Sequence, residues 1–123
     1  MPFVVFRDRV RRRLDVSANG TLTFDDFAAI LRLRTGDARD YTVLFDVSGA
    51  APEVSASQVH SAADVVKARA ERDGPRGRFA IVAAEEAVFG LALSYVQMCQ
   101  RAGIDTIAVF STREEAERWL SED

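Results

Sequence analysis

Residues 79–84 read FAIVAA, an unbroken apolar run with Arg78 before it and Glu85-Glu86 after it. Two similar runs lie on either side of it in the sequence, Tyr41–Val47 (YTVLFDV) and Thr106–Phe110 (TIAVF). Strands that are apolar on both faces are typical of the middle of a sheet that helices cover. The three runs therefore predict a sheet with residues 79–84 at its centre.

Capping boxes mark the starts of three predicted helices. The boxes pair Thr23 with Asp26, Ser55 with Gln58, and Thr112 with Glu115. The first helix is expected to end near Gly36, with Arg32 and Arg34 on its outer side, and the second at Asp73-Gly74-Pro75. A further helix is expected from about Glu86 to Arg101, with Gly103 ending it.

The N-terminal segment predicts an antiparallel hairpin of residues 3–7 and 10–17, because apolar and polar residues alternate along the second part. In this register Arg12 falls on the inward face. Asn19-Gly20 is expected to turn the chain toward the first helix, and residues 48–52 to form a loop. A basic cluster accompanies the hairpin: Arg7, Arg9, Arg11, Arg12 and Arg13. It either grips phosphates or keeps an outer strand soluble and unpaired, and we favour the second interpretation.

The elements follow in the order ββαβαβαβα, which predicts right-handed crossovers and a parallel core. We expect an α/β fold: a single domain over residues 1–123, with a mixed, mostly parallel five-stranded sheet flanked by four helices.

Composition excludes several classes of function. The net charge of −3 over 123 residues offers nucleic acid no general attraction. No apolar segment approaches the ~20 residues needed to span a bilayer, and MPFVVFRDR has no basic region before its apolar run, as a secretory signal would. Cys99 is the one cysteine, so any disulfide would link two chains. We expect a cytoplasmic protein.

The helix over residues 86–101 carries more apolar surface than a sheet requires. Its apolar arc spans roughly 200° at ~100° per residue. Phe89, Ala92, Val96 and Cys99 account for the sheet-facing half, which leaves Leu91, Tyr95 and Met98, with Val88 at the edge. This surplus predicts a homodimer interface or an apolar ligand. The alternative, that other parts of the chain cover these four residues, stays open.

The sequence contains no residue pattern that indicates catalysis, a metal or a cofactor. His60 lies one helical turn before Asp64, which predicts an exposed pair on the helix surface. Cys99 falls on an apolar helix face and is expected in the core. Glu85-Glu86 are explained by the helix dipole, which stabilises acidic residues in the first turn of a helix. We therefore expect no enzyme.

A ligand site, if the chain has one, is expected beyond the carboxyl ends of the parallel strands. The residues expected at this rim are Asp46, Ser48, Gly49, Ser55, Ser57, Glu85, Ser111, Thr112 and Arg113. Several helix N-termini point to the same rim, which favours binding of an anionic group. The acidic residues at the rim disfavour a highly charged anion.

Four phrases resemble the SpoIIAA-like proteins, a family grouped with the STAS and Sec14-like domains: NGTLTFDDF, LFDVSG, FAIVAAEEAVFGLALSY and VFSTREEAERWL. The resemblance implies a small mixed sheet flanked by helices, in a branch whose members mostly have no assigned activity. STAS regulators switch partners when a serine at the start of the second helix is phosphorylated, usually in an Asp-Ser-Ser-Gly-like context. Here residues 53–58 read EVSASQ, which lacks that aspartate and glycine. Ser55 and Ser57 are candidate phosphosites, and we favour helix capping for Ser55.

Two functions follow from these observations. The first is a non-catalytic regulatory or protein-interaction module of STAS type, acting as a homodimer or with a regulatory protein partner. The second is a carrier or sensor of a small apolar or lipid-like ligand, as the Sec14-like resemblance implies.

Overall fold

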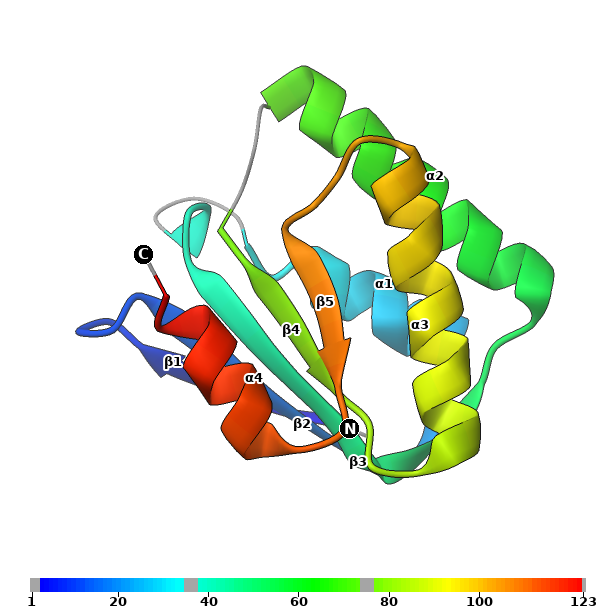
Figure 1. Ribbon diagram of the computed structural model, residues 1–123, viewed down its shortest axis with the longest axis horizontal. Helices are drawn as coiled ribbons and strands as arrows, with labels where there is room; N and C mark the ends of the chain where they lie inside the picture. The colour runs from blue at the N-terminus through cyan, green and yellow to red at the C-terminus, as the bar shows by residue number, and fades with distance from the viewer. Residues whose placement is uncertain (1–2, 35–37, 74–76, 123) are drawn as a thin grey trace.

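The computed structural model describes residues 3–34, 38–73 and 77–122. Over these ranges the elements follow the predicted order ββαβαβαβα (Figure 1). The strands are β1 (Phe3–Asp8), β2 (Arg13–Thr23), β3 (Thr42–Glu53), β4 (Phe79–Val82) and β5 (Ile107–Phe110). The helices are α1 (Phe24–Leu31), α2 (Ala56–Asp73), α3 (Glu86–Arg101) and α4 (Arg113–Leu120). The predicted α/β fold class is confirmed.

The described strands form one sheet in the order β1-β2-β3-β4-β5. β1 is antiparallel to β2, and all other neighbouring strands are parallel. β4 lies between β3 and β5, and every residue of Phe79–Val82 is buried. The stretch is buried inside the sheet as predicted, but the central strand of the five is β3 rather than β4. The TIAVF run instead forms the outer strand β5, where helices on both sides of the sheet explain its apolar character.

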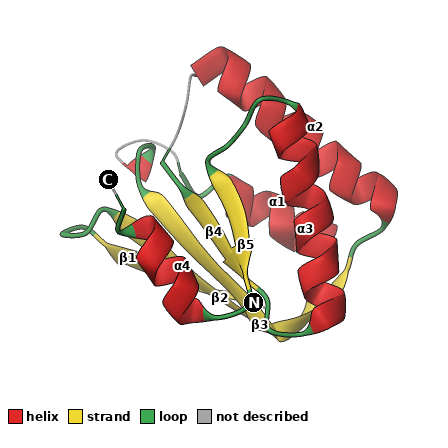
Figure 2. Cartoon of the chain, in the orientation of Figure 1, coloured by secondary structure: helices red, strands yellow, loops and turns green. Residues whose placement is uncertain are grey.

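Helices cover both faces of the sheet, and α4 lies apart from the other three (Figure 2). On one face a large core joins Ile30 of α1, Val59 and Ala62 of α2, Val96 and Cys99 of α3, and Val43, Phe45 and Ile81 of the sheet. On the other face α4 contributes Ala116, Trp119 and Leu120, which pack with Leu44, Ala80, Val82 and Phe110. Successive residues of β3 and β4 thus point into different cores, which is why these strands are apolar throughout.

Side-chain caps start three helices as predicted. Thr23 and Asp26 form a reciprocal capping box at α1, with the Thr23 N–H donating to the Asp26 carboxylate at 2.9 Å. Ser55 and Gln58 do the same at α2, with donor–acceptor distances of 2.9 and 3.2 Å. At α4 the Glu115 N–H donates to the Thr112 hydroxyl. That last cap differs from the predicted box, because the Glu115 carboxylate accepts from the hydroxyls of Ser111 and Thr112 rather than from the Thr112 N–H.

The hairpin turn falls later in the chain than predicted. Residues 9–12 form the turn, so Val10 is 94% exposed rather than part of β2. The Asp8 carboxylate causes this, because it accepts hydrogen bonds from the N–H groups of Val10 and Arg11 at 3.1 and 2.9 Å. Arg12 has a positive φ of 57° in this turn and is exposed. The expectation that it faces inward is wrong.

Two segments expected to be irregular are instead strands. Asn19-Gly20 does not turn the chain but continues β2, and residues 48–52 continue β3. These segments pair with each other, Asn19 with Gly49 and Gly20 with Ala50, after a bulge between Ser17 and Asn19. Each therefore supplies the backbone partners that the other needs. The close approach suits Gly49, because a Cβ there would lie 2.7 Å from Asn19 Oδ1 and 3.2 Å from the Ala18 carbonyl oxygen.

The described helix ends agree with prediction for α2 and α3 but not for α1. α3 covers Glu86–Arg101 as expected, and Gly103 follows it with a φ of 84°. α2 reaches Asp73, while Gly74 and Pro75 lie outside the described residues. α1 ends at Leu31, earlier than the expected stop at Gly36, which also lies outside the described residues.

Candidate functional site

The polar residues expected at the rim make local contacts rather than one site. The Asp46 carboxylate accepts from the Ser48 N–H at 2.9 Å. The Ser55 and Ser57 hydroxyls lie 3.1 Å apart at the start of α2. Glu85 is exposed at the N-cap of α3 and makes no side-chain cap there, and Ser111 and Thr112 bond to Glu115. β3 also runs on past Asp46, so its carboxyl end lies elsewhere.

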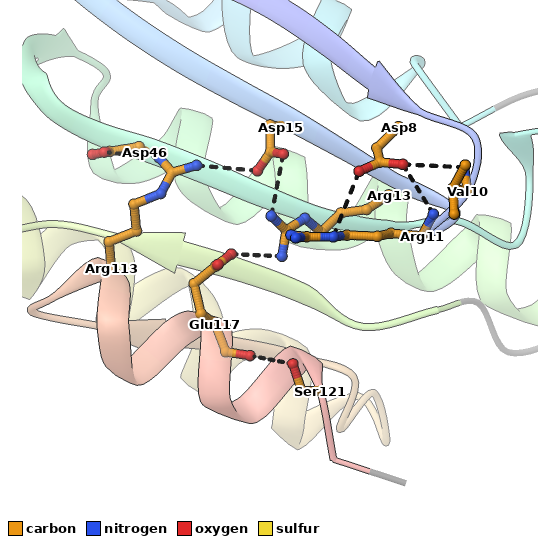
Figure 3. A network of polar contacts seen from close by, with 9 residues as sticks. All are labelled: Asp8, Val10, Arg11, Arg13, Asp15, Asp46, Arg113, Glu117 and Ser121. Carbon is orange, nitrogen blue, oxygen red and sulfur yellow. Dashed lines mark hydrogen bonds and ion pairs between the residues drawn. The ribbon is translucent and has the colours of Figure 1, made fainter.

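One pair of rim residues, from different elements, meets on the α4 side of the sheet. Arg113 of α4 lies 3.6 Å from Asp46 and 3.2 Å from Asp15 of β2. The Arg13 guanidinium in turn contacts two carboxylates, that of Asp15 at 3.3 Å and that of Glu117 in α4 at 2.5 Å (Figure 3). Arg13 is only 8% exposed. This network attaches α4 to β2.

The basic cluster of the hairpin is divided between the two faces of the sheet. Arg13 belongs to the network with α4, whereas the guanidinium groups of Arg7 and Arg12 each lie 5.3 Å from the centre of the Tyr41 ring. Arg11 pairs with Asp8 at 3.7 Å. β1 is an outer strand, as the favoured interpretation of the cluster expects.

The surplus apolar arc of α3 packs largely within the chain. Tyr95 is 4% exposed, and its ring meets that of Phe27 edge-to-face at a centroid distance of 5.3 Å. Val88, Leu91 and Met98 are half-buried and pack against the same core. These four residues, predicted as a dimer interface, therefore offer no continuous exposed face. The alternative that other parts of the chain cover these residues therefore holds for Tyr95.

An apolar groove does open between α3, α1 and the start of α2. Its volume is about 70 Å³. Its walls include Leu22, Phe27, Phe45, Val59, Leu91 and Tyr95. Tyr95 supplies the single polar side-chain atom among the described lining residues. Val88, Leu91 and Tyr95, which the sequence marks as surplus, lie on this groove beside Ala92 of the same helix, while its other walls come from segments that the sequence does not connect.

Tyr95 and Cys99 are buried together behind this groove. Burial raises the pKa of the Cys99 thiol from 9.0 to about 11. Burial also raises the pKa of Tyr95, with a smaller contribution from Cys99, while the charges of Arg34 and Arg69 lower it. The Tyr95 hydroxyl interacts with the Cys99 thiol, and this contact raises the pKa of Tyr95 and lowers that of Cys99, the second by less than burial raises it. Both groups are neutral at pH 7, and the prediction of a buried Cys99 is confirmed.

A second and larger pocket, of about 260 Å³, lies at the amino ends of β4 and β5. Its walls include Leu31, Arg34, Val66, Arg69, Phe79 and Ile104. The sequence places Arg34 on the outer side of a helix, and this is wrong, since α1 ends before it and Arg34 is buried. Its guanidinium donates to the carbonyl oxygens of Tyr41 and Gly77 at 3.1 and 2.5 Å.

Other kinds of site find little support in the described part of the chain. There, no three His, Cys, Asp or Glu side chains gather where they could hold a metal ion. None of the helices described is both long and apolar enough to cross a membrane. His60 and Asp64 form the predicted exposed pair on α2, 3.9 Å apart.

The chain is similar in structure to an uncharacterized protein from the DUF3478 family of Shewanella loihica PV-4, which has a SpoIIAA-like fold. The TM-score is 0.54 at 20% sequence identity, and the match covers 96% of this chain and 93% of that one. The chain has a SpoIIAA-like fold. No protein-family model matches it, and no curated protein is significantly similar in sequence. A SpoIIAA-like fold is what the sequence resemblance implies, and at this identity the likeness concerns the fold alone.

Proposed function

We propose that the chain is a non-catalytic binding module that holds a small apolar ligand in the groove between α1, α2 and α3. The observation that carries this proposal is the chemistry of the walls. Every described lining side chain is apolar except for the Tyr95 hydroxyl. Such a surface binds hydrocarbon by the hydrophobic effect, at about 0.8 kcal/mol for each methylene removed from water.

The size of the groove limits the ligand. Its 70 Å³ is less than half of the roughly 150 Å³ of an engineered apolar cavity that binds benzene. The buried part of the ligand is therefore a short alkyl or branched group, and any remainder extends from the groove toward solvent.

The acidity of the nearest titratable groups supports binding rather than catalysis. Nucleophilic or acid–base catalysis needs a group whose pKa lies near the working pH. Cys99, with its pKa at about 11, and Tyr95, with its pKa raised above the ordinary value, hold their protons at pH 7.

Hexan-1-ol is the probe for the groove, and methyl NMR detects its binding. We expect saturable shifts at Val59, Val88 and Leu91, and their loss in Ala92→Phe, which fills the groove. Ala87→Phe is the matched control, because Ala87 is exposed on the same helix; it should bind hexan-1-ol like the unmodified chain. Shifts that fail to saturate, or that persist unchanged in a folded Ala92→Phe, contradict the proposal.

A second function, a homodimer, finds support on β1 rather than on α3. Val4 and Phe6 are 66% and 63% exposed on this outer strand, and Val5 is 37% exposed. Val4 and Phe6 lie on the face that α4 covers elsewhere, over β3, β4 and β5, whereas Val5, which pairs with Val16, lies on the other face. An exposed apolar edge strand invites pairing with another chain.

A second copy fits this strand. Antiparallel pairing about a two-fold axis centred on Val5 places Val4 opposite Phe6 of the other protomer, on one face. Light scattering after size-exclusion chromatography tests this dimer. We expect Phe6→Lys to give monomers and Val10→Lys, in the neighbouring turn, to leave the dimer intact. A chain that is strictly monomeric at high concentration contradicts it.

A further inference from the structure

The apolar groove lies where two neighbouring strands end together. β2 and β3 are parallel, and their last residues, Thr23 and Glu53, pair with each other. α1 begins directly after β2, and α2 begins at Ala56, with Val54 and Ser55 between it and β3. The starts of α1 and α2 therefore lie close together at the groove.

Each of these helix starts contributes two apolar side chains to the groove. In both cases one residue precedes the N-cap and the other lies in the first helical turn after it. The pairs are Leu22 and Phe27 around the Thr23 cap, and Val54 and Val59 around the Ser55 cap. These are the two positions of a hydrophobic staple, which fixes the angle at which the chain enters a helix. Part of the groove wall is therefore built from helix-start signals.

The Ser55 cap connects the two valines on its sides. The Ser55 N–H donates to the Gln58 side-chain oxygen at 2.9 Å, and the Gln58 N–H donates to the Ser55 hydroxyl at 3.2 Å. The Val59 N–H donates to the Ser55 carbonyl oxygen at 3.0 Å. Because the first N–H groups of a helix have no partner within the helix, this turn frays more readily when its cap is lost. Fraying would displace Val54 and Val59 from the groove wall.

The two helix starts are secured differently. On the α1 side, the Phe27 ring packs against the rings of Phe45 and Tyr95, at centroid distances of 6.1 and 5.3 Å. On the α2 side, Val54 is half-buried, and the hydrogen bonds of the adjacent cap lie at the exposed surface. The wall at α2 therefore depends more on its cap than the wall at α1 does.

We propose that the capping box of Ser55 and Gln58 positions the α2 wall of the groove and thereby sets the affinity for the apolar ligand. Ser55 acts through Val54 and Val59 and does not contact the ligand itself. A preformed wall does not have to be ordered when the ligand binds, whereas a frayed wall lowers the fraction of chains that can bind. This inference rests on the proposed function of the groove and assigns a role in it to a surface serine.

Hexan-1-ol titrations test the role of the cap, with methyl NMR at Val88 and Leu91 as the readout, because both line the groove from α3. We expect Ser55→Ala to weaken binding about threefold or more. Ser55→Asp also caps a helix, and it should restore the affinity of the unmodified chain.

Thr112→Ala is the matched control for a loss of stability. Thr112 caps α4 by accepting from the Glu115 N–H at 3.3 Å, and α4 packs on the other face of the sheet. This variant loses a cap of the same kind, yet it should bind hexan-1-ol like the unmodified chain. A Ser55→Ala chain that binds as tightly as Thr112→Ala overturns the proposal.

Amide hydrogen exchange of the ligand-free chains separates this proposal from the proposed function. The Val59 N–H should exchange about fivefold faster in Ser55→Ala and at an unchanged rate in Thr112→Ala. If the unmodified chain does not bind hexan-1-ol, the proposed function is wrong, and the exchange of Val59 still decides whether the cap holds this wall. Unchanged exchange of Val59 in Ser55→Ala overturns the positioning role.

Discussion

Arg13 of β2 and Glu117 of α4 form an ion pair with an N–O distance of 2.5 Å, and the Arg13 side chain is 10% exposed. This contact and the pairs around Asp15 connect the last helix to the strand beside the edge of the sheet (Figure 3). The Glu117 side chain is 39% exposed, so solvent weakens the pair.

We expect Glu117→Gln to destabilise the fold by about 1–2 kcal/mol, because it leaves Arg13 buried with one carboxylate fewer. Glu114→Gln is the control. Glu114 pairs with Arg118 on the surface of α4 at 86% exposure, and its replacement should change stability by less than about 0.5 kcal/mol. Urea unfolding measures both, and equal losses would show that the Arg13 pair contributes nothing particular.

Gly49 tests the long parallel ladder between β2 and β3. Gly49→Ala should lower the free energy of unfolding by about 1–2 kcal/mol, since its Cβ would lie 3.2 Å from the Ala18 carbonyl oxygen and closer still to the Asn19 side chain. Gly90→Ala, in the interior of α3, should instead stabilise by about 0.5–1 kcal/mol, because the added Cβ would lie more than 4 Å from every described atom outside the adjoining helix backbone. Thermal unfolding should separate the two variants in opposite directions, and a neutral Gly49→Ala would contradict the tight approach.

Ser55 should matter to stability through its cap. Ser55→Ala removes the acceptor for the Gln58 N–H and should destabilise by about 1 kcal/mol. Ser55→Asp should restore most of this loss, because a carboxylate caps a helix and complements its dipole. Ser57→Ala, at the second residue of the same helix, should be nearly neutral. If chemical denaturation finds Ser55→Ala as stable as Ser57→Ala, the capping role is wrong.

The stability of the fold should fall at alkaline pH. Cys99 has a folded-state pKa of about 11, above its ordinary 9.0, and the pKa of Tyr95 is also raised. The unfolded chain therefore releases these protons first, so their contribution is complete below pH 9 and is lost as pH rises toward 11. Urea unfolding between pH 7 and pH 11 measures the decline, and Tyr95→Phe should reduce it.

Tyr95→Phe should change stability at pH 7 by less than about 1 kcal/mol, because the described partner of the buried hydroxyl is the Cys99 thiol, and thiols form only weak hydrogen bonds. A large loss of stability at pH 7 would show that this hydroxyl makes a stronger hydrogen bond.

Local patterns explain which parts of the fold could be predicted. The apolar run at Phe79–Val82 and the caps at Thr23 and Ser55 depend on neighbouring residues alone. Pairing between Asn19 and Gly49 does not, because each looks like a turn until the other strand is placed beside it. For this reason the sequence predicts the end of β3 too early, and the expected rim is misplaced as well.

The two pockets lay beyond the sequence for a similar reason. Helical periodicity puts Arg34 on the outside, and its burial follows from the early end of α1 and from the carbonyl groups of Tyr41 and Gly77. The groove at Tyr95 required the positions of three helices at once. Periodicity did identify Val88 and Leu91 as unusual, although not what they line.

Native mass spectrometry of freshly purified protein tests the proposed binding function most directly. We expect the chain to carry an additional mass that is released on denaturation, and the Ala92→Phe chain, with its groove filled, to lack it. Ligand-free protein in both preparations, each at the mass of its own chain, would contradict a module that holds a small apolar ligand between α1, α2 and α3.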